Sequence, residues 1–191
     1  MALDQLGIFN DALLLIGERS LSSLTEPRET QRRLTEVWEF GAVNYCLELV
    51  KPSFAHQVVR LNSPSPSTLD GFNFSHSLPA EYVTTVGVFE DGELDQRVDR
   101  FLIQNRALLT DYDDVYLRFI TNAYPIANWD PSFARVVSAY LAREMAERIN
   151  ATVYDTVNGK FEQRVQIAQA LAQESQTCLL YNLTLPTTPY V

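Results

Sequence analysis

The chain has 191 residues, 46% of them hydrophobic, which is enough to bury a sizeable core in one domain. Its 24 acidic residues outnumber its 15 basic ones, and the net charge of −9 argues against a protein whose main task is to grip phosphate backbones. An acidic surface is compatible with letting DNA pass without holding it, because like charges repel. The longest apolar run is residues 12–16 and no secretory signal precedes it, so we expect a soluble protein made in the cytoplasm.

Two helices are predicted in the first fifty residues. The first covers residues 3–17, where apolar residues recur at three- and four-residue spacing until Gly17, which can close a helix in the left-handed conformation. The second covers residues 27–50, with Thr25 as its cap and Pro27 in its first turn. Its apolar face is expected to contain Leu34, Val37, Trp38, Gly41, Tyr45 and Leu49.

The next thirty residues give weaker signals. Residues 54–61 fit either a short helix or an extended segment, and the sequence leaves both open. Residues 62–79 are rich in Ser, Pro, Gly and Asn, so we predict a long loop without regular hydrogen bonding. Phe72 and Phe74 within it indicate that the loop packs on another surface.

An antiparallel sheet is predicted over residues 81–120. Residues 82–89 are β-branched and aromatic, and an acidic, glycine-containing turn follows at 90–93. Further strands are expected at 97–104, 107–110 and 115–120. The links between them are too short for parallel crossovers, so a meander of three or four strands is expected.

The last third returns to helix, with predicted segments 131–150 and 160–180. Asp130-Pro131 suits a helix start, and Asn158-Gly159 is expected to break the chain between the two helices. The last helix should carry a packing seam formed by Phe161, Val165, Ala168, Ala172, Ser175 and Leu179. Residues 183–191 contain two prolines and are predicted to be an extended tail. The fold class is therefore α+β: one domain, residues 1–182, in which two N-terminal and two C-terminal helices form a bundle with an inserted β-meander.

Candidate chemical groups are few. Asp111, Asp113 and Asp114 could supply oxygen ligands to a hard cation, but the glycine and distal glutamate of an EF-hand are absent, which favours a turn between strands. His56 and His76 lie beside loops, without the spacing of a metal or nucleophile motif, so we expect surface residues.

The two cysteines also lack a chemical context. Cys46 and Cys178 lie far apart on predicted helices, with no CxxC partner, which favours buried free thiols over a disulfide or a zinc site. The chain has no GxSxG motif and no phosphate-cradling glycine loop. No constellation of residues therefore supports a catalytic, metal or cofactor site, although the residues alone leave an enzyme open.

Short motifs follow one another in a fixed order along the chain. The N-terminal ones are Asn10-Asp11-Ala12-Leu13, Ile16-Gly17-Glu18, Ser22 with Leu24, and a long helix with Trp38. The later ones are Leu78-Pro79-x-Glu81-Tyr82, Ala123-Tyr124-Pro125, Trp129-Asp130 with Phe133, and an Ala-rich last helix. In this order and in its α-α-β-α-α layout, the chain resembles the tail tubular protein A family, the tail adaptors of short-tailed bacteriophages.

The resemblance implies a virion structural protein without an active site or cofactor. That family is similar in fold to the head-completion and connector proteins of long-tailed phages, a helical bundle with an inserted antiparallel sheet. Its members form a ring, commonly a dodecamer, below the portal vertex. Such a head-tail connector would be assembled in the host bacterial cytoplasm and would lie in the tail or neck of the virion.

The implied partners are other copies in the ring, the portal protein, the tail nozzle protein and DNA, but no membrane. DNA would pass through the lumen, without specific binding, during genome ejection. Six residues form the candidate interface: Leu183, Leu185, Tyr190, Val191, Phe72 and Phe74. The tail, residues 183–191, is predicted to dock on an adjoining subunit or on the portal. Two alternatives are a metal-dependent enzyme or nuclease that uses Asp111, Asp113 and Asp114, and a monomeric tail assembly chaperone.

Overall fold

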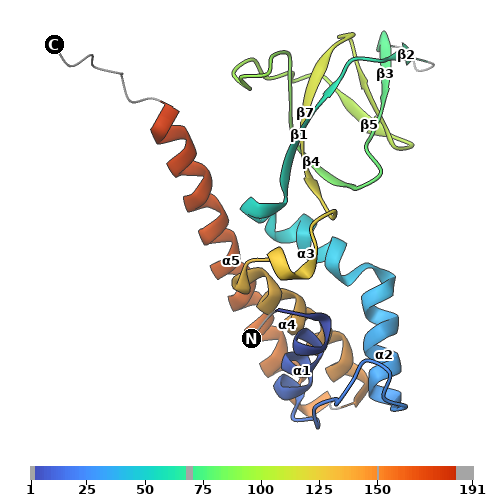
Figure 1. Cartoon of the computed structure of the whole chain (residues 1–191), viewed down its shortest axis with the longest axis vertical. Helices are drawn as coiled ribbons and strands as arrows, with labels where there is room; N and C mark the ends of the chain where they lie inside the picture. Colours follow the sequence, from blue (N-terminus) through green and yellow to red (C-terminus); the bar gives the residue numbers. More distant parts are fainter. Residues whose placement is uncertain (1–2, 68–70, 150, 184–191) are drawn as a thin grey trace, which may run out of the picture. The chain divides into compact units, whose positions relative to one another are not determined.

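The chain separates into two compact units (Figure 1). In this computed structural model the described backbone covers residues 3–67, 71–149 and 151–183, and the described side chains exclude residues 148–151 and 175–183 as well. The helical unit contains Met1–Phe54 and Tyr124–Val191, and the β unit contains Ala55–Ala123. The α+β class predicted from the sequence is confirmed. Whereas one domain was expected, the inserted strands form a unit with a hydrophobic core of its own.

Helix α4 lies at the centre of the helical unit. The described elements of this unit are α1 (Gln5–Ile16), α2 (Glu29–Val37), a π-helical turn η1 (Trp38–Ala42), α3 (Val43–Val50), a 3-10 turn η3 (Ile126–Asn128), α4 (Pro131–Ile149), a 3-10 turn η4 (Ala151–Val153) and α5 (Tyr154–Leu183). Helix α4 packs against α1, α2, α3 and α5. Its buried side chains therefore occur around most of its circumference rather than along one stripe.

Both ends of α1 are set by single residues. The Asp4 carboxylate accepts a hydrogen bond from the Gly7 N–H at 2.7 Å, so the helix begins at Gln5, two residues later than predicted. Gly17 ends the helix as predicted, with φ of 78° in the left-handed region. Leu14, an apolar residue of the same helix, is 72% exposed.

The second predicted helix is divided in two at Gly41. This glycine has φ of 110° within η1, a conformation that side chains rarely adopt. The chain is kinked at this glycine, and the buried face shifts by one position after it. After the turn the buried residues are Ala42, Cys46, Leu47 and Val50, in place of the predicted Gly41, Tyr45 and Leu49. The helix also begins later than predicted, because Arg28 and not Thr25 stands at its first boundary.

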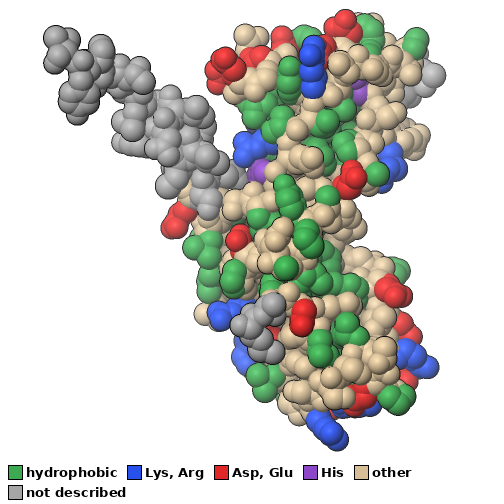
Figure 2. All heavy atoms as spheres, in the orientation of Figure 1, with side chains coloured by type: hydrophobic (Ala, Val, Ile, Leu, Met, Phe, Trp, Pro, Cys, Tyr) green, Lys and Arg blue, Asp and Glu red, His purple; other side chains and the backbone are tan. Residues whose placement is uncertain are grey.

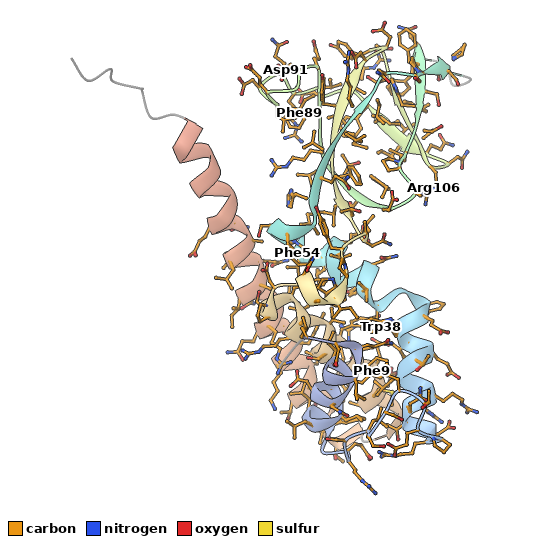
Figure 3. All side chains as sticks on the ribbon, viewed as in Figure 1. Phe9, Trp38, Phe54, Phe89, Asp91 and Arg106 are labelled. Atoms are coloured by element: carbon orange, nitrogen blue, oxygen red, sulfur yellow. The ribbon has the colours of Figure 1, made fainter. Side chains whose placement is uncertain are left out.

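Aromatic rings join the segments around α4. The Trp38 ring contacts the Phe9 ring edge-on at 5.6 Å between centroids and stacks on the Trp129 ring at 6.2 Å. Figure 3 shows Phe9 and Trp38 side by side where α1 meets the π-helical turn. The series continues through Phe133, which lies 5.1 Å from Trp129 and 5.4 Å from Phe54. These contacts connect α1, the turn η1 and the start of α4 with Phe54, the last residue of the helical unit before the β unit.

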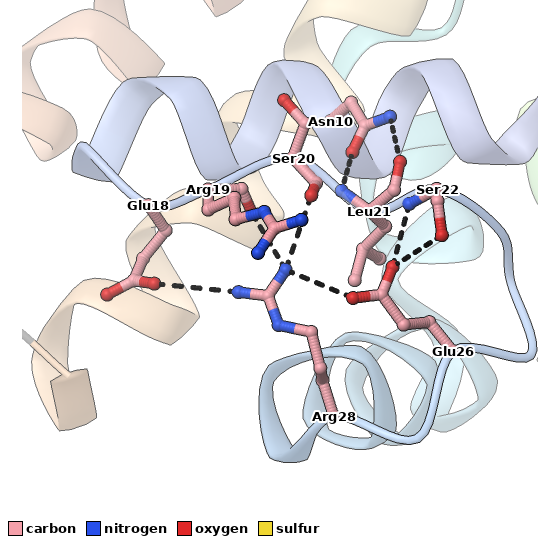
Figure 4. Close-up of polar contacts among 8 residues, drawn as sticks. All are labelled: Asn10, Glu18, Arg19, Ser20, Leu21, Ser22, Glu26 and Arg28. Carbon is pink, nitrogen blue, oxygen red and sulfur yellow. Dashed lines mark hydrogen bonds and ion pairs between the residues drawn. The ribbon is translucent and has the colours of Figure 1, made fainter.

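The loop between α1 and α2 is held by polar side chains (Figure 4). The Asn10 amide donates to the Leu21 carbonyl at 3.1 Å and accepts from the Leu21 N–H at 2.7 Å, as a second backbone strand would. Arg28 binds the carbonyl groups of Arg19 and Ser20 and the carboxylates of Glu18 and Glu26. Glu26 also accepts hydrogen bonds from Ser22, which fixes the turn.

A partly buried network of polar side chains connects three helices. The Asp11 carboxylate on α1 accepts hydrogen bonds from the Ser138 hydroxyl on α4 and from the Arg164 guanidinium on α5, the latter at 3.1 Å. Arg164 also donates to the Arg135 carbonyl at 2.8 Å. Hydrogen bonds that involve charged groups are stronger than neutral ones, so this network fixes the relative positions of α1, α4 and α5.

Helix α5 begins earlier than predicted and continues through Asn158-Gly159. The buried side chains of Val157 and Phe161 lie on either side of this dipeptide, so tertiary packing outweighs its low helix propensity. The predicted seam is confirmed for the four described members, which are buried: Phe161, Val165, Ala168 and Ala172. The side chains of Ser175 and Leu179 lie outside the described set.

The β unit contains two antiparallel sheets. One has the order β1-β7-β4, formed by β1 (His56–Leu61), β4 (Tyr82–Phe89) and β7 (Val115–Thr121). The other has the order β2-β3-β6-β5, formed by β2 (Ser65–Pro66), β3 (Phe74–Ser77), β5 (Leu102–Gln104) and β6 (Ala107–Thr110). Both sheets contribute to a core that includes Val88, Leu108 and Leu117.

Several predictions for this unit need correction. Residues 62–79 are not simply a loop, because β2 and β3 pair within them and β3 also pairs with β6. The expected strand 97–104 is reduced to β5 and a single bridge between Arg97 and Phe89. The prediction of a meander is also wrong, because β7 pairs with β1 and β4 rather than with β6, the strand that precedes it in the sequence. Residues 54–61 contain both of the structures that the sequence left open: the short 3-10 helix η2 (Ser53–Ala55) leads directly into the extended strand β1.

The unusual backbone at Gly41 gives a test of the divided helix. We expect Gly41→Ala to lower the free energy of unfolding by about 1–3 kcal/mol, because alanine is strained at this φ although there is space for its methyl group. The matched control is Gly159→Ala in α5, which should raise stability by about 0.5–1 kcal/mol because alanine favours helix. Urea denaturation measures both; an unchanged stability for Gly41→Ala would contradict the assigned conformation.

Candidate interaction surfaces

The acidic cluster between β6 and β7 is engaged by arginines. Asp111 forms an ion pair with Arg100 at 2.8 Å, and Asp114 accepts from the Arg60 Nε at 2.9 Å and from a second Arg60 nitrogen. The Arg60 guanidinium holds the pKa of the Asp114 carboxyl below its usual value. Asp113 is exposed beside them. Within the described residues no three His, Cys, Asp or Glu side chains gather as a metal site. By its position the cluster connects β6 to β7.

The two histidines differ from each other. His76 was predicted at the surface but is buried in β3, where its Nε2 lies 3.0 Å from the Tyr112 carbonyl oxygen. The prediction failed because the segment that contains it is a paired strand rather than a loop. The His76 Nδ1 and the Thr110 Oγ1 are buried without a hydrogen-bond partner among the described residues. His56 in β1 accepts from the Arg118 Nε at 3.2 Å.

Cys46 is a core residue. Its side chain is buried in α3, and this burial raises the pKa of the thiol to about 12. The nucleophilic form of cysteine is the thiolate, so a buried thiol with this pKa is unreactive at neutral pH. The Cys178 side chain lies outside the described set.

The reactivity of Cys46 gives a pH-dependent test. In a Cys178→Ser chain at pH 8, we expect iodoacetamide to alkylate folded Cys46 on the order of 10³-fold more slowly than in urea, because the folded thiol is protonated and enclosed. The folded-state rate should continue to rise with pH towards about 12, whereas the unfolded rate levels off near the ordinary thiol pKa. Mass spectrometry follows the label, and similar rates in both states would contradict burial of the thiol.

The predicted interface residues in the β unit hold their own segment in place. Phe72 is half-buried and lies under the Arg100 guanidinium, 5.1 Å from the ring centroid. Phe74 begins β3, opposite Pro66 and Thr110. Neither residue belongs to the strongly exposed apolar side chains of the described chain.

The other predicted interface residues are only partly placed. Leu183 is the last residue of α5, so the helix includes the first residue of the predicted tail. Its side chain lies outside the described set. Leu185, Tyr190 and Val191 lie outside the described residues altogether.

A first exposed apolar surface surrounds Phe40. This side chain is 96% exposed, at a hollow of about 550 Å³ between the η1 turn, α3 and α4. The Tyr45 and Tyr140 rings lie in the wall, 4.9 Å apart. We call this hollow the Phe40 groove; its other lining residues are Arg33, Glu36, Val37, Gly41, Ala42, Glu144 and Met145. This groove was not predicted, although Phe40 is a large apolar residue that lies off the predicted buried face of its helix.

A second exposed apolar surface lies on α5. Ile167 and Leu171 are one helical turn apart and are 51% and 47% exposed. We call this pair the α5 strip. It was also missed, although both residues are apolar and lie off the predicted seam.

Phe40 and Ile167 lie on different flanks of the helical unit. On α5, Gln169 donates to the Leu49 carbonyl at 2.9 Å and so marks the flank next to α3, the helix that carries Tyr45. At about 100° per residue, Ile167 and Leu171 each lie about 160–200° around the helix from Gln169. Ile167 therefore faces away from the flank of α3, whereas Leu171 also lines a second hollow with Val50 at the end of α3 and Phe133 on α4.

Charges on the surface are mixed. Figure 2 shows acidic and basic side chains interspersed over the face that it draws. Seven arginines in the described part of the chain form ion pairs with carboxylates: Arg28, Arg32, Arg33, Arg60, Arg100, Arg143 and Arg164. These pairings reduce the positive charge offered to phosphates, in line with the negative net charge.

Comparison of the sequence with models of known protein families and with curated proteins gives no match. Among the described residues, none of the helices combines the length and the apolar character needed to span a bilayer.

Proposed function

We propose that this chain is a phage tail adaptor, a structural protein that forms a ring between the portal of the DNA-filled head and the tail nozzle. The order of motifs along the sequence supports the family. The observation that carries ring assembly is the presence of two different exposed apolar surfaces on one helical unit, the Phe40 groove and the α5 strip, with Phe40 and Ile167 on different flanks.

Symmetry explains why two different surfaces matter. A twofold dimer uses the same patch on both subunits, whereas a ring repeats one contact between two unlike patches. Exposed Phe40 on one flank and exposed Ile167 on the other fit the second arrangement. In the proposed ring, the flank with the α5 strip of each subunit lies against the flank with the Phe40 groove of the next.

The chemistry of the surface suits a channel for DNA. The net charge is −9, and the arginines in the described ion pairs are already bound to carboxylates. Weak attraction to phosphates lets a duplex slide rather than bind. The alternative of a metal-dependent enzyme gains no support from the acidic cluster, because Asp111 and Asp114 are paired with Arg100 and Arg60.

Substitution within the α5 strip tests ring formation. We expect Ile167→Asp to raise the concentration needed for assembly on the portal at least tenfold, because a charge would be desolvated at every subunit contact. The matched control is Gln166→Asp, an exposed neighbour that points to another side of α5 and should assemble like the wild type. Native mass spectrometry of the full chain mixed with portal measures assembly; equal assembly of both variants would contradict the proposed contact.

The composition of virions decides between an adaptor and a chaperone. In purified particles the adaptor should be present at a fixed ratio to portal, equal to the ratio of the two rings. A monomeric tail assembly chaperone would be absent from the finished particle. Quantitative mass spectrometry of purified virions gives this ratio, and absence of the chain would overturn the proposed function.

A further inference from the structure

We propose that residues 184–191 of one copy bind in the Phe40 groove of a second copy. This inference rests on the self-assembly proposed above and names the segment that occupies the groove. Three observations carry it: the aromatic character of the groove, the composition of the segment, and the distance that separates the segment from the groove of its own chain.

The groove has the chemistry of a site for an extended, proline-containing segment. Phe40 is almost fully exposed beside it, and the paired Tyr45 and Tyr140 rings form a wall. Grooves lined by aromatic rings recognise proline-rich segments, which are preformed in the extended polyproline conformation and lose little entropy on binding. Arg33 and Glu144 lie at the same groove, so its rim carries both signs of charge and favours no strongly charged ligand.

Residues 184–191 match that chemistry. Their sequence is Thr-Leu-Pro-Thr-Thr-Pro-Tyr-Val, with Pro186 and Pro189 three residues apart, the spacing that places two prolines on one side of a polyproline helix. Leu185, Tyr190 and Val191 add apolar and aromatic surface around this core. The segment contains no charged side chain, which suits the mixed rim of the groove.

The segment cannot reach the groove of its own chain. The Tyr140 ring lies 5.9 Å from the Phe161 ring, which places this wall of the groove beside the first part of α5. From Phe161 to Leu183 the helix rises by about 33 Å, at about 1.5 Å per residue. Pro189 lies within about 21 Å of Leu183 even in a fully extended chain. The groove that receives Pro186 and Pro189 therefore belongs to another copy.

A labelled peptide tests the groove directly. We expect a fluorescent peptide of residues 184–191 to bind the full chain saturably and to be released by the unlabelled peptide. Phe40→Ala should weaken binding at least tenfold, and it should leave the fold intact because the ring is exposed. The matched control is Leu14→Ala, an exposed apolar residue on α1 outside the groove, which should change affinity less than twofold. No saturable binding, or equal affinity for both variants, overturns the inference.

Cross-linking between copies tests the exchange. A photoreactive benzoylphenylalanine in place of Phe40, in a mixture of isotopically heavy and light full chains assembled on portal, should give heavy-to-light links to residues 184–191. Links only within one copy, or links of this segment to portal instead, overturn the inference. If rings form but the peptide does not bind, the inference fails and the adaptor function stands. If the peptide binds in the groove but no ring forms on portal, the adaptor function fails and the groove assignment stands.

Discussion

The close packing around α4 is the constraint on which the helical unit depends. This helix carries fully buried alanines at positions 139, 142 and 146, so neighbouring backbones can approach it closely. A helix that is buried on most sides must be covered by other elements, and α1, α3 and α5 supply that cover. The polar link from Asp11 to Ser138 and Arg164 then fixes which faces of α1 and α5 are turned inwards. The orientation of α1 and α5 also determines which of their side chains stay exposed, including the α5 strip.

The residues that carry the family resemblance have structural roles in this arrangement. Asn10 holds the backbone of Leu21, Gly17 ends α1, and Trp38 stacks on Trp129. None of these contacts forms a chemical site. These motif residues therefore serve the packing of the helical unit.

Local signals in the sequence predicted the elements that local physics controls. The end of α1 at Gly17 and the strand β4 were predicted because a glycine stop and a β-branched run act over a few residues. Three features depend instead on contacts between residues that are distant in the sequence: the turn at Gly41, the helix through Gly159 and the order of the strands in the sheets. The spacing of apolar residues along the chain carries no information about such contacts. The same limit explains why Phe40 and Ile167 were missed: a pattern finds buried faces, whereas exposure depends on which elements pack beside them.

The way in which the β unit is inserted bears on how such a protein could work. The chain leaves the helical unit after Phe54 and re-enters it at Tyr124, and these two rings meet edge-on at 6.3 Å. Because the segment begins and ends at one place, the helical unit can close its own core without any residue of the insertion. The β unit likewise has its own core around Leu117. Each unit can therefore carry a separate binding surface, and a change of partner at one need not disturb the packing of the other.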